Sequence, residues 1–305
     1  MKTSYNILWV DDDPKSVDTD QEDVKDYLEE YGIRADITFV EAPADGSVKE
    51  KLEHDLKNQD LDILMVDYHM EGLKGDQLVR LIRETDHIYL PVIFYSSSSV
   101  SDLLDAVREA ELDGVYIANR SALMNKVKSV VGSLLVREQT VKQVRGLLME
   151  GVSEIDTQFN DIFQKVWPGL SEEQQPQVVS YLQGILNERA KSASSKAAKL
   201  PEDLEGFGAH IAEKFLTASY DTYTRWRLTK KILELAGHSA DDIAELKRFA
   251  VLPEGEKPLN GLRNDYAHKS RKLLAEDHSD ARCVEIRKAL RSQSANIDSI
   301  LGSET

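Results

Sequence analysis

The first 120 residues alternate short apolar runs with amphipathic stretches, and this alternation limits the fold more than any other feature of the chain. The apolar runs have the length of strands, and the apolar spacing between them predicts helices of about 8 to 18 residues. Five strands are expected, at Tyr5–Val10, Asp36–Glu41, Asp62–Val66, Pro91–Tyr95 and Gly114–Ala118. Strands that alternate with helices form a parallel sheet covered by helices. The sequence therefore predicts a doubly wound α/β domain.

Aspartates follow two of these predicted strands. Asp11, Asp12 and Asp13 come directly after the first strand, and Asp67 follows the third. Ligands of open α/β sheets bind at the carboxyl ends of the strands, so these side chains are expected to gather there. A hard divalent cation would neutralise such a cluster. Asp13 precedes a proline and is interpreted as the N-cap of the next helix, which gives it a structural role.

Over about residues 4–130 the chain resembles the receiver domain of two-component response regulators. The resemblance depends on four segments: Val10–Pro14, Ile63–Asp67, Gly72 to Asp76, and Pro91–Ser96. It implies a flavodoxin-like sheet of five parallel strands. It further implies that Asp67 accepts a phosphoryl group from a sensor histidine kinase or a phosphotransfer protein, with Mg²⁺ bound beside it.

The resemblance also assigns roles to individual residues. Asp12 and Asp67 would bind Mg²⁺ directly, Asp11 would bind it through water, and the backbone carbonyl of His69 would complete the protein ligands. Ser96 would donate a hydrogen bond to a phosphoryl oxygen and draw its loop inward. For the His69 side chain two interpretations stay open: it tunes the lifetime of the phosphoryl group, or it is an exposed loop histidine.

One departure from the family pattern concerns the end of the fifth strand. The family has a lysine there that pairs with the acyl phosphate, and Ala118 stands at that position. Arg120 follows two residues later, and the sequence does not establish that it reaches the site. A degenerate receiver that acts as an unphosphorylated binding module is therefore an alternative. A haloacid-dehalogenase-type phosphatase is disfavoured, because Lys15 stands where that family has a threonine.

Beyond residue 120 the apolar spacing is helical throughout. We expect a receiver domain at residues 1–132, a helical connector at 133–170 and an all-α output domain at 171–305. The output domain should contain helices at about 171–199, 202–218, 220–236, 239–249, 258–275 and 279–301. Because the fifth helix of receiver domains commonly lies in a dimer interface, a homodimer is also expected.

The most pointed motif of the helical part runs from Leu262 to His268. It resembles the signature of HEPN domains, helical bundles of which many are metal-independent ribonucleases. By that resemblance Arg263 would steady a phosphate, His268 would transfer a proton and Asn264 would position them. Similar stretches occur in helical proteins of the mannitol-repressor kind, where no cleavage is implied. We therefore keep two hypotheses for this domain, a ribonuclease and, ranked slightly higher, a protein-binding module.

Basic residues near this motif offer weak support for RNA binding, although solvated helix surface is their default interpretation. They are Arg225, Arg227, Lys230, Lys231, Lys269, Arg271 and Lys272. Tyr220, Tyr223 and Trp226 are interpreted as core residues rather than base-stacking residues.

Charge, cysteine content and hydropathy bear on DNA binding, disulfide bonds and cellular location. The net charge is −16, and residues 1–132 carry 14 basic and 28 acidic side chains. A DNA-binding output is disfavoured because no clearly basic helix is evident. The lone Cys283 excludes an internal disulfide and is interpreted as a small apolar filler on a helix. Without an apolar run of about 18 residues or a signal segment, the protein is expected in the cytoplasm and away from membranes.

Overall fold

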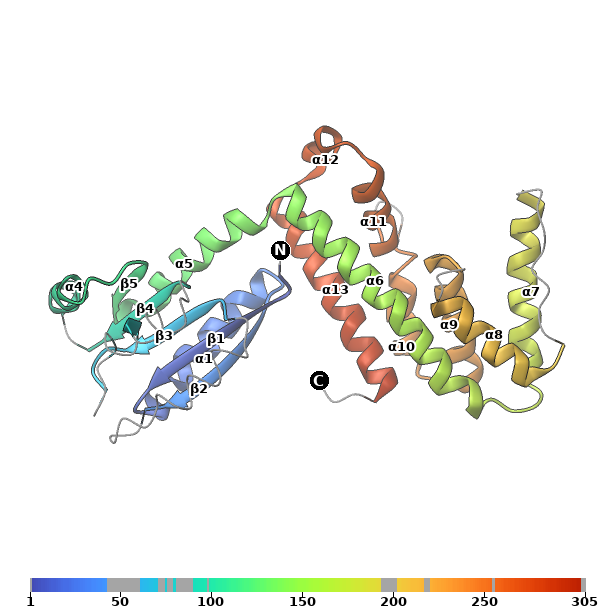
Figure 1. The fold of residues 1–305 in the computed structure, drawn as a ribbon, viewed down its shortest axis with the longest axis horizontal. Helices are drawn as coiled ribbons and strands as arrows, with labels where there is room; N and C mark the ends of the chain where they lie inside the picture. Colours follow the sequence, from blue (N-terminus) through green and yellow to red (C-terminus); the bar gives the residue numbers. More distant parts are fainter. Residues whose placement is uncertain are drawn as a thin grey trace. The chain divides into compact units, whose positions relative to one another are not determined.

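A computed structural model describes residues 2–42, 61–70, 75, 79–80, 90–97, 99–192, 202–216, 220–253 and 256–302. The chain divides into two compact units, residues 1–140 and 141–305 (Figure 1). The division lies later than the boundary expected at residue 132. Each unit has its own core and is described separately below.

The first unit contains one sheet of five parallel strands. They are β1 (Ser4–Asp11), β2 (Arg34–Glu41), β3 (Ile63–Asp67), β4 (Val92–Ser96) and β5 (Val115–Asn119). Their order is β2-β1-β3-β4-β5, as in flavodoxin-like folds. This confirms the predicted fold, and each strand lies within two residues of its expected bounds. The order reverses between β1 and β3, so the carboxyl ends of these two strands form the switch point where such folds bind ligands.

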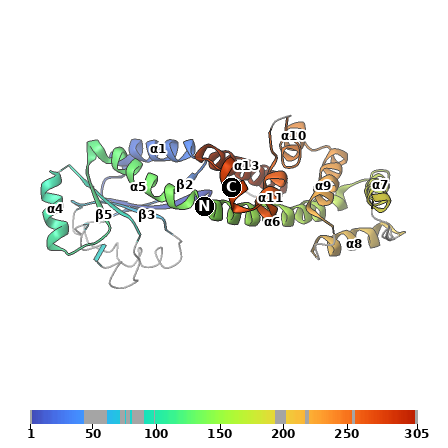
Figure 2. The ribbon, with the colours of Figure 1, turned by 90° about the horizontal axis from the view of Figure 1, so that it is seen from above.

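Helices cover both faces of this sheet. α1 (Pro14–Glu30) and α5 (Leu123–Glu138) lie on one face (Figure 2), and α4 (Val100–Glu109) packs on the other. Alternate β1 residues explain the two cores: Trp9 packs with α1 and α5, whereas Val10 packs on the α4 side. As predicted, Asp13 is the N-cap of α1 and accepts a hydrogen bond from the amide of Lys15 at 3.2 Å. The helices expected between β2 and β4 lie largely outside the described residues.

The second unit is helical throughout its described part, as predicted. Its elements are α6 (Val141–Val166), α7 (Gln175–Ser192), α8 (Leu204–Leu216), α9 (Thr222–Ala236), α10 (Ala240–Arg248), α11 (Leu259–His268), α12 (Arg271–Asp277) and α13 (Asp280–Leu301). The core of this unit is built around α6, which packs against α8, α9, α11 and α13. The segment expected to be a connector at 133–170 therefore contains the central helix of the second unit.

Two helices differ from the prediction in ways that side-chain hydrogen bonds explain. The helix expected at 258–275 is broken in two, because Ser270 leaves the helix and caps α12. The helix expected from Ser171 begins only at Gln175, since a turn at Ser171 precedes it; its predicted end at 199 lies outside the described residues. Gly237 at φ +76° ends α9, as expected for a C-cap.

Candidate functional site

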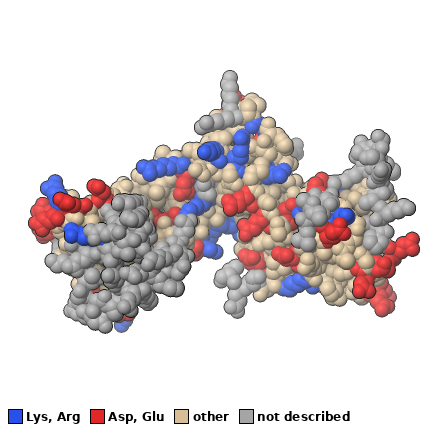
Figure 3. Space-filling model, viewed as in Figure 1, with Lys and Arg blue, Asp and Glu red and all other residues tan. Residues whose placement is uncertain are grey.

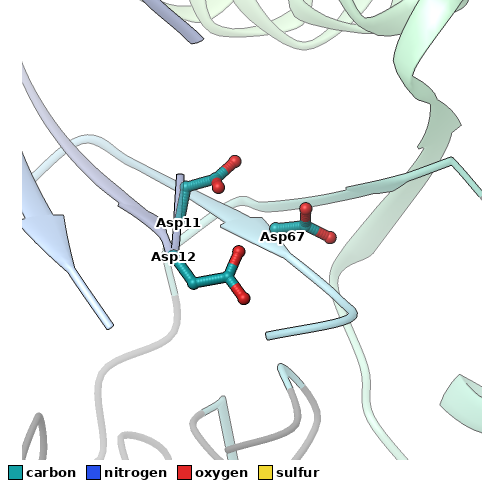
Figure 4. A group of neighbouring side chains, drawn as sticks. All are labelled: Asp11, Asp12 and Asp67. Atoms are coloured by element: carbon teal, nitrogen blue, oxygen red, sulfur yellow. The ribbon is translucent and has the colours of Figure 1, made fainter. Parts of the chain in front are cut away.

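The three aspartates at the switch point converge. Asp11 and Asp12 lie at the end of β1, and Asp67 lies at the end of the neighbouring β3 (Figure 4). Each contributes a carboxylate oxygen, and these oxygens lie within 4.8 Å of one another. Three clustered carboxylate oxygens are the donor set that Mg²⁺ prefers. The residues present therefore fit the metal that the sequence predicts.

Asp11 is completely buried and held by three hydrogen bonds. Its Oδ1 accepts from the amide of Asp13 at 2.8 Å. Its Oδ2 accepts from the hydroxyl of Tyr95 and, at 2.8 Å, from Nη2 of Arg120. Trp9 Nε1 in turn donates to the Tyr95 hydroxyl at 2.7 Å. Asp11 is thus fixed in position by three partners, of which Tyr95 is itself buried and held by Trp9.

Sequence analysis did not single out Tyr95. Burial, and then its hydrogen bond to Asp11, raise the pKa of this phenol, so it stays a neutral donor. The alternation of side chains along the strands could have indicated Tyr95, because it shows which side chains share a face of the sheet. Trp9 and Asp11 lie on one face of β1, and Tyr95 lies on the same face of β4. A tyrosine near a strand end whose side chain lies on the same face of the sheet as a buried carboxylate can donate a hydrogen bond to it.

Arg120 reaches the aspartate cluster. Its Nη2 lies 2.8 Å from Asp11 Oδ2 and 3.3 Å from Asp67 Oδ2. Ala118, at the position of the family's lysine, is buried and pairs with Tyr95 across the sheet. Arg120 opens a short 3-10 turn, Arg120–Ala122, whose N-cap is Asn119. The guanidinium also lies over the Tyr95 ring, 5.3 Å from its centroid. The chain therefore supplies a cation to the cluster from the turn after β5.

Asp67 is 9% exposed, and its environment disfavours the ionised form. Burial is the main reason that its pKa is raised, and the charges of Asp11 and Asp12 add to this. Two groups act in the opposite direction: the His69 amide, which donates to Asp67 Oδ1 at 3.0 Å, and Arg120. The His69 side chain is exposed, and its carbonyl as a metal ligand stays a prediction. An ionised Asp67 thus gains from any further cation at the site.

Ser96 ends β4 and is completely buried. The preceding residue, Tyr95, pairs with Asp67, so Ser96 lies at the same edge of the sheet as the aspartates. Of the predicted segment from Gly72 to Asp76, only Gly75 lies among the described residues. A Cβ at Gly75 would come within 3.2 Å of the Asp67 carbonyl oxygen, which accounts for a glycine at this approach to β3.

The predicted site residues of the second unit all lie on α11. Arg263 is half-buried and donates to the side chain of its neighbour Asn264 at 3.1 Å, whereas Asn264 and His268 are exposed on α11. Five residues along a helix place Arg263 and His268 about 140° apart around its axis. Their roles in phosphate binding and proton transfer stay predictions.

Most of the basic residues proposed for an RNA path have acidic partners. Arg225 is 4% exposed and pairs with Asp156 at 2.7 Å, so the expectation that it lines a surface path is wrong. Arg227, Lys230 and Lys269 pair with Glu188, Glu234 and Asp265. The side chains of Arg271 and Lys272 lie outside the described residues. On the face drawn in Figure 3, the described basic residues of the second unit are interspersed with acidic ones.

Two of the three aromatic residues interpreted as core, Tyr220 and Trp226, are buried as expected. The same interpretation is wrong for Tyr223, which is 41% exposed and stacks on Trp226. Cys283 is buried on α13, as expected for an apolar filler. None of the helices in the described ranges is long and apolar enough to cross a membrane.

Comparison with known proteins gives one short sequence match and structural alignments of low similarity. No family model matches the chain. A stretch of 91 residues is 32% identical to the CAI-1 autoinducer sensor kinase/phosphatase CqsS of Vibrio cholerae, which covers 28% of this chain and only 13% of that protein. The RcsB response regulator of Salmonella typhimurium aligns with 16% identity and a TM-score of 0.31 over 79% of this chain and 95% of its own. FixJ from B. japonicum aligns with 15% identity and a TM-score of 0.31 over 81% of this chain and 97% of its own.

At these identities and TM-scores neither aligned structure bears on what the present chain does. The assignment depends instead on the sheet order and on the carboxylates at its switch point. Together these features fit the receiver domain that the first part of the sequence resembles, followed by a helical unit.

Proposed function

We propose that this protein is a response regulator that accepts a phosphoryl group on Asp67 from a phosphohistidine of a sensor histidine kinase or a phosphotransfer protein. The observation that carries the proposal is the cluster of Asp11, Asp12 and Asp67 at the switch point of the sheet. The sheet alone is shared by proteins of many functions, whereas this cluster has a specific chemistry.

The two oxygens of Asp67 have different surroundings. Oδ1 accepts the His69 amide, and Oδ2 faces Arg120 across 3.3 Å. Oδ2 is therefore the proposed nucleophile. Its attack on phosphorus forms an O–P bond while the N–P bond to the donor imidazole breaks, and the imidazole leaves with the electron pair and takes up a proton. Ser96 would donate its hydroxyl to a phosphoryl oxygen.

The metal ligands would be Asp12 and Asp67, with Asp11 acting through water and the His69 carbonyl completing the set. Bound Mg²⁺ supplies positive charge that offsets the repulsion between a carboxylate and an incoming phosphoryl group. Asp11 also has a role that requires no metal, because it holds both Tyr95 and Arg120 beside the nucleophile.

A small acyl phosphate tests the proposal with the full-length protein. We expect the wild type to take up one phosphoryl group per chain when Mg²⁺ is present, and Asp67→Asn to take up none. Asp13→Asn is the matched control, because asparagine caps a helix as well as aspartate does. Equal uptake by wild type and Asp67→Asn would contradict the assignment. No uptake by either would favour the alternative of an unphosphorylated binding module.

For the second unit we propose a protein-binding output. One feature supports it over a ribonuclease: Arg225, Arg227 and Lys230, which were candidates for an RNA path, are paired with acidic side chains. Incubation of the purified protein with RNA, beside His268→Ala, separates the two. Cleavage by the wild type that disappears in the variant would establish the ribonuclease. No cleavage by the wild type agrees with a binding module.

We also propose that the protein forms a homodimer through its first unit. Val136 on α5 is 77% exposed, an apolar side chain on the helix that receiver domains commonly use for dimers. Light scattering with and without acyl phosphate tests this. A Val136→Glu variant should shift the mass toward the monomer, and an unchanged dimer would exclude this helix from the interface.

A further inference from the structure

We infer that Arg120 replaces the family's lysine and pairs with the phosphoryl group on Asp67, from the turn after β5 rather than from the strand itself. The inference rests on the proposed phosphorylation of Asp67. The sequence alone does not establish this role for Arg120, because Ala118 stands at the aligned position.

The two contacts of Arg120 are unequal. Hydrogen bonds between charged nitrogen and oxygen atoms are normally about 2.7 to 2.9 Å long. The contact with Asp11 is within this range at 2.8 Å, and the contact with Asp67 is longer at 3.3 Å. Asp11 is also completely buried and held by other donors. Asp11 is therefore the fixed anchor of the guanidinium, and the contact with Asp67 is the one that can be exchanged.

The guanidinium has the donors that a phosphoryl group needs. Both contacts described above use the same nitrogen, Nη2. Arginine carries N–H donors on two further nitrogens, in a planar fork that matches phosphate oxygens. A phosphoryl group on Oδ2 of Asp67 would lie on the side that faces Arg120. The arginine can thus stay on Asp11 while its other donors turn to the phosphoryl oxygens.

The charge balance favours this exchange. Arg120 faces carboxylates on three elements: Asp11 on β1, Asp67 on β3 and Asp20 on α1, and the Arg120 charge opposes the rise that burial causes in the pKa of Asp20. A phosphorylated side chain carries about −1.5 to −2 charges near neutral pH, more than the single charge of a carboxylate. Phosphorylation therefore strengthens the pull on Arg120 from the Asp67 side.

The position of Arg120 also couples the phosphoryl group to the start of α5. Arg120 begins the turn Arg120–Ala122, and α5 starts at the next residue, Leu123. A rotation of the guanidinium about its contact with Asp11, toward the phosphoryl oxygens, pulls on the turn that starts α5. We therefore expect phosphorylation to change backbone protection at residues 120–127.

Hydrogen exchange of the full-length protein, with and without acyl phosphate and Mg²⁺, tests the inference. The variants are Arg120→Ala, Arg120→Lys and the control Arg108→Ala, whose side chain is 79% exposed on α4. Each protein is compared with its own unphosphorylated form, so that a loss of stability in a variant cancels. Beryllium fluoride with Mg²⁺ serves as the phosphoryl analogue for any variant that labels slowly.

We expect a phosphorylation-dependent change at residues 120–127 in the wild type and Arg108→Ala, its loss in Arg120→Ala, and its partial recovery in Arg120→Lys. The same change in Arg120→Ala as in the wild type would overturn the inference. Faster phosphorylation of Arg120→Ala, with the hydrogen-exchange change at residues 120–127 retained, would also overturn it, because Arg120 would then only block access to Asp67. Failure of the wild type to label at all would instead count against phosphorylation of Asp67.

Discussion

The buried ion pair between Arg225 and Asp156 yields the sharpest stability prediction for the second unit. Arg225 on α9 is 4% exposed; its Nη1 lies 2.7 Å from Asp156 Oδ2, and its Nε donates to the Tyr220 carbonyl at 2.9 Å. Arg225→Met keeps much of the side-chain length but removes the charge. Removing one partner of a buried pair costs about 3 to 5 kcal/mol, because the other charge is left without compensation. Asp156 is 17% exposed, so we expect a loss near the lower limit, about 3 kcal/mol.

The same variant should show a pH dependence of known sign. Burial raises the pKa of Asp156, and the Arg225 charge is the main influence that lowers it again. Without Arg225 this pKa rises further above its unfolded value of about 3.9. The stability from a group with a raised pKa is fully present below the unfolded pKa and is lost as the pH rises through the folded pKa. The variant should therefore lose more stability at neutral pH than at about pH 4.

Hydrogen exchange of the α9 amides measures this loss, because it reports the opening of the second unit separately from the first. Arg227→Met is the matched control on the same helix. Its partner Glu188 is 68% exposed, and an exposed pair contributes about 0 to 1 kcal/mol. Adding Asp156→Asn to Arg225→Met should recover part of the loss, since it removes the stranded charge. If Arg225→Met costs no more than Arg227→Met, the argument from burial fails.

Further changes test local features of both units. Asp221→Ala removes the N-cap of α9 and should lower the free energy of unfolding, measured in urea, by about 1 kcal/mol. An unchanged free energy of unfolding would show that the cap does not contribute to stability. On α6, Gly146→Ala has open space and should stabilise by about 0.5 to 1 kcal/mol. Gly151→Ala would place its Cβ 2.8 Å from the Leu290 side chain and should destabilise the second unit. If both substitutions stabilised it equally, the close packing of Gly151 against Leu290 would be refuted. Burial raises the pKa of Asp67, so Asp67→Asn should stabilise the metal-free protein at neutral pH. The gain in stability should shrink as the pH falls toward about 4, and a gain independent of pH would contradict this.

Strand positions and the aspartate cluster could be predicted from the sequence because both depend on short-range patterns. An apolar run ended by an aspartate fixes a strand and its carboxyl end, and parallel pairing then brings Asp11, Asp12 and Asp67 together. The reach of Arg120 could not be predicted in the same way. It depends on the turn that Asn119 caps after β5, and the length of a strand pattern does not specify that geometry.

In the second unit the sequence interpretation failed where polar residues occupy unexpected places. Arg225 was expected on a basic surface, yet Asp156 on a distant helix allows its burial, and a pairing across 69 residues has no local signal. The continuous helix expected at 258–275 is interrupted because the Ser270 hydroxyl competes for backbone amides. The α6 segment was taken for a connector because its helical spacing alone does not show how many helices surround it.

The identity of the phosphoacceptor is most directly measured by chemical trapping. Borohydride reduces an aspartyl phosphate to homoserine, which mass spectrometry locates in a peptide. After treatment of the full-length protein with acyl phosphate, the proposal predicts homoserine at position 67, dependent on Mg²⁺ and absent from Asp67→Asn. Homoserine at another aspartate, or at none in the presence of Mg²⁺, would contradict it.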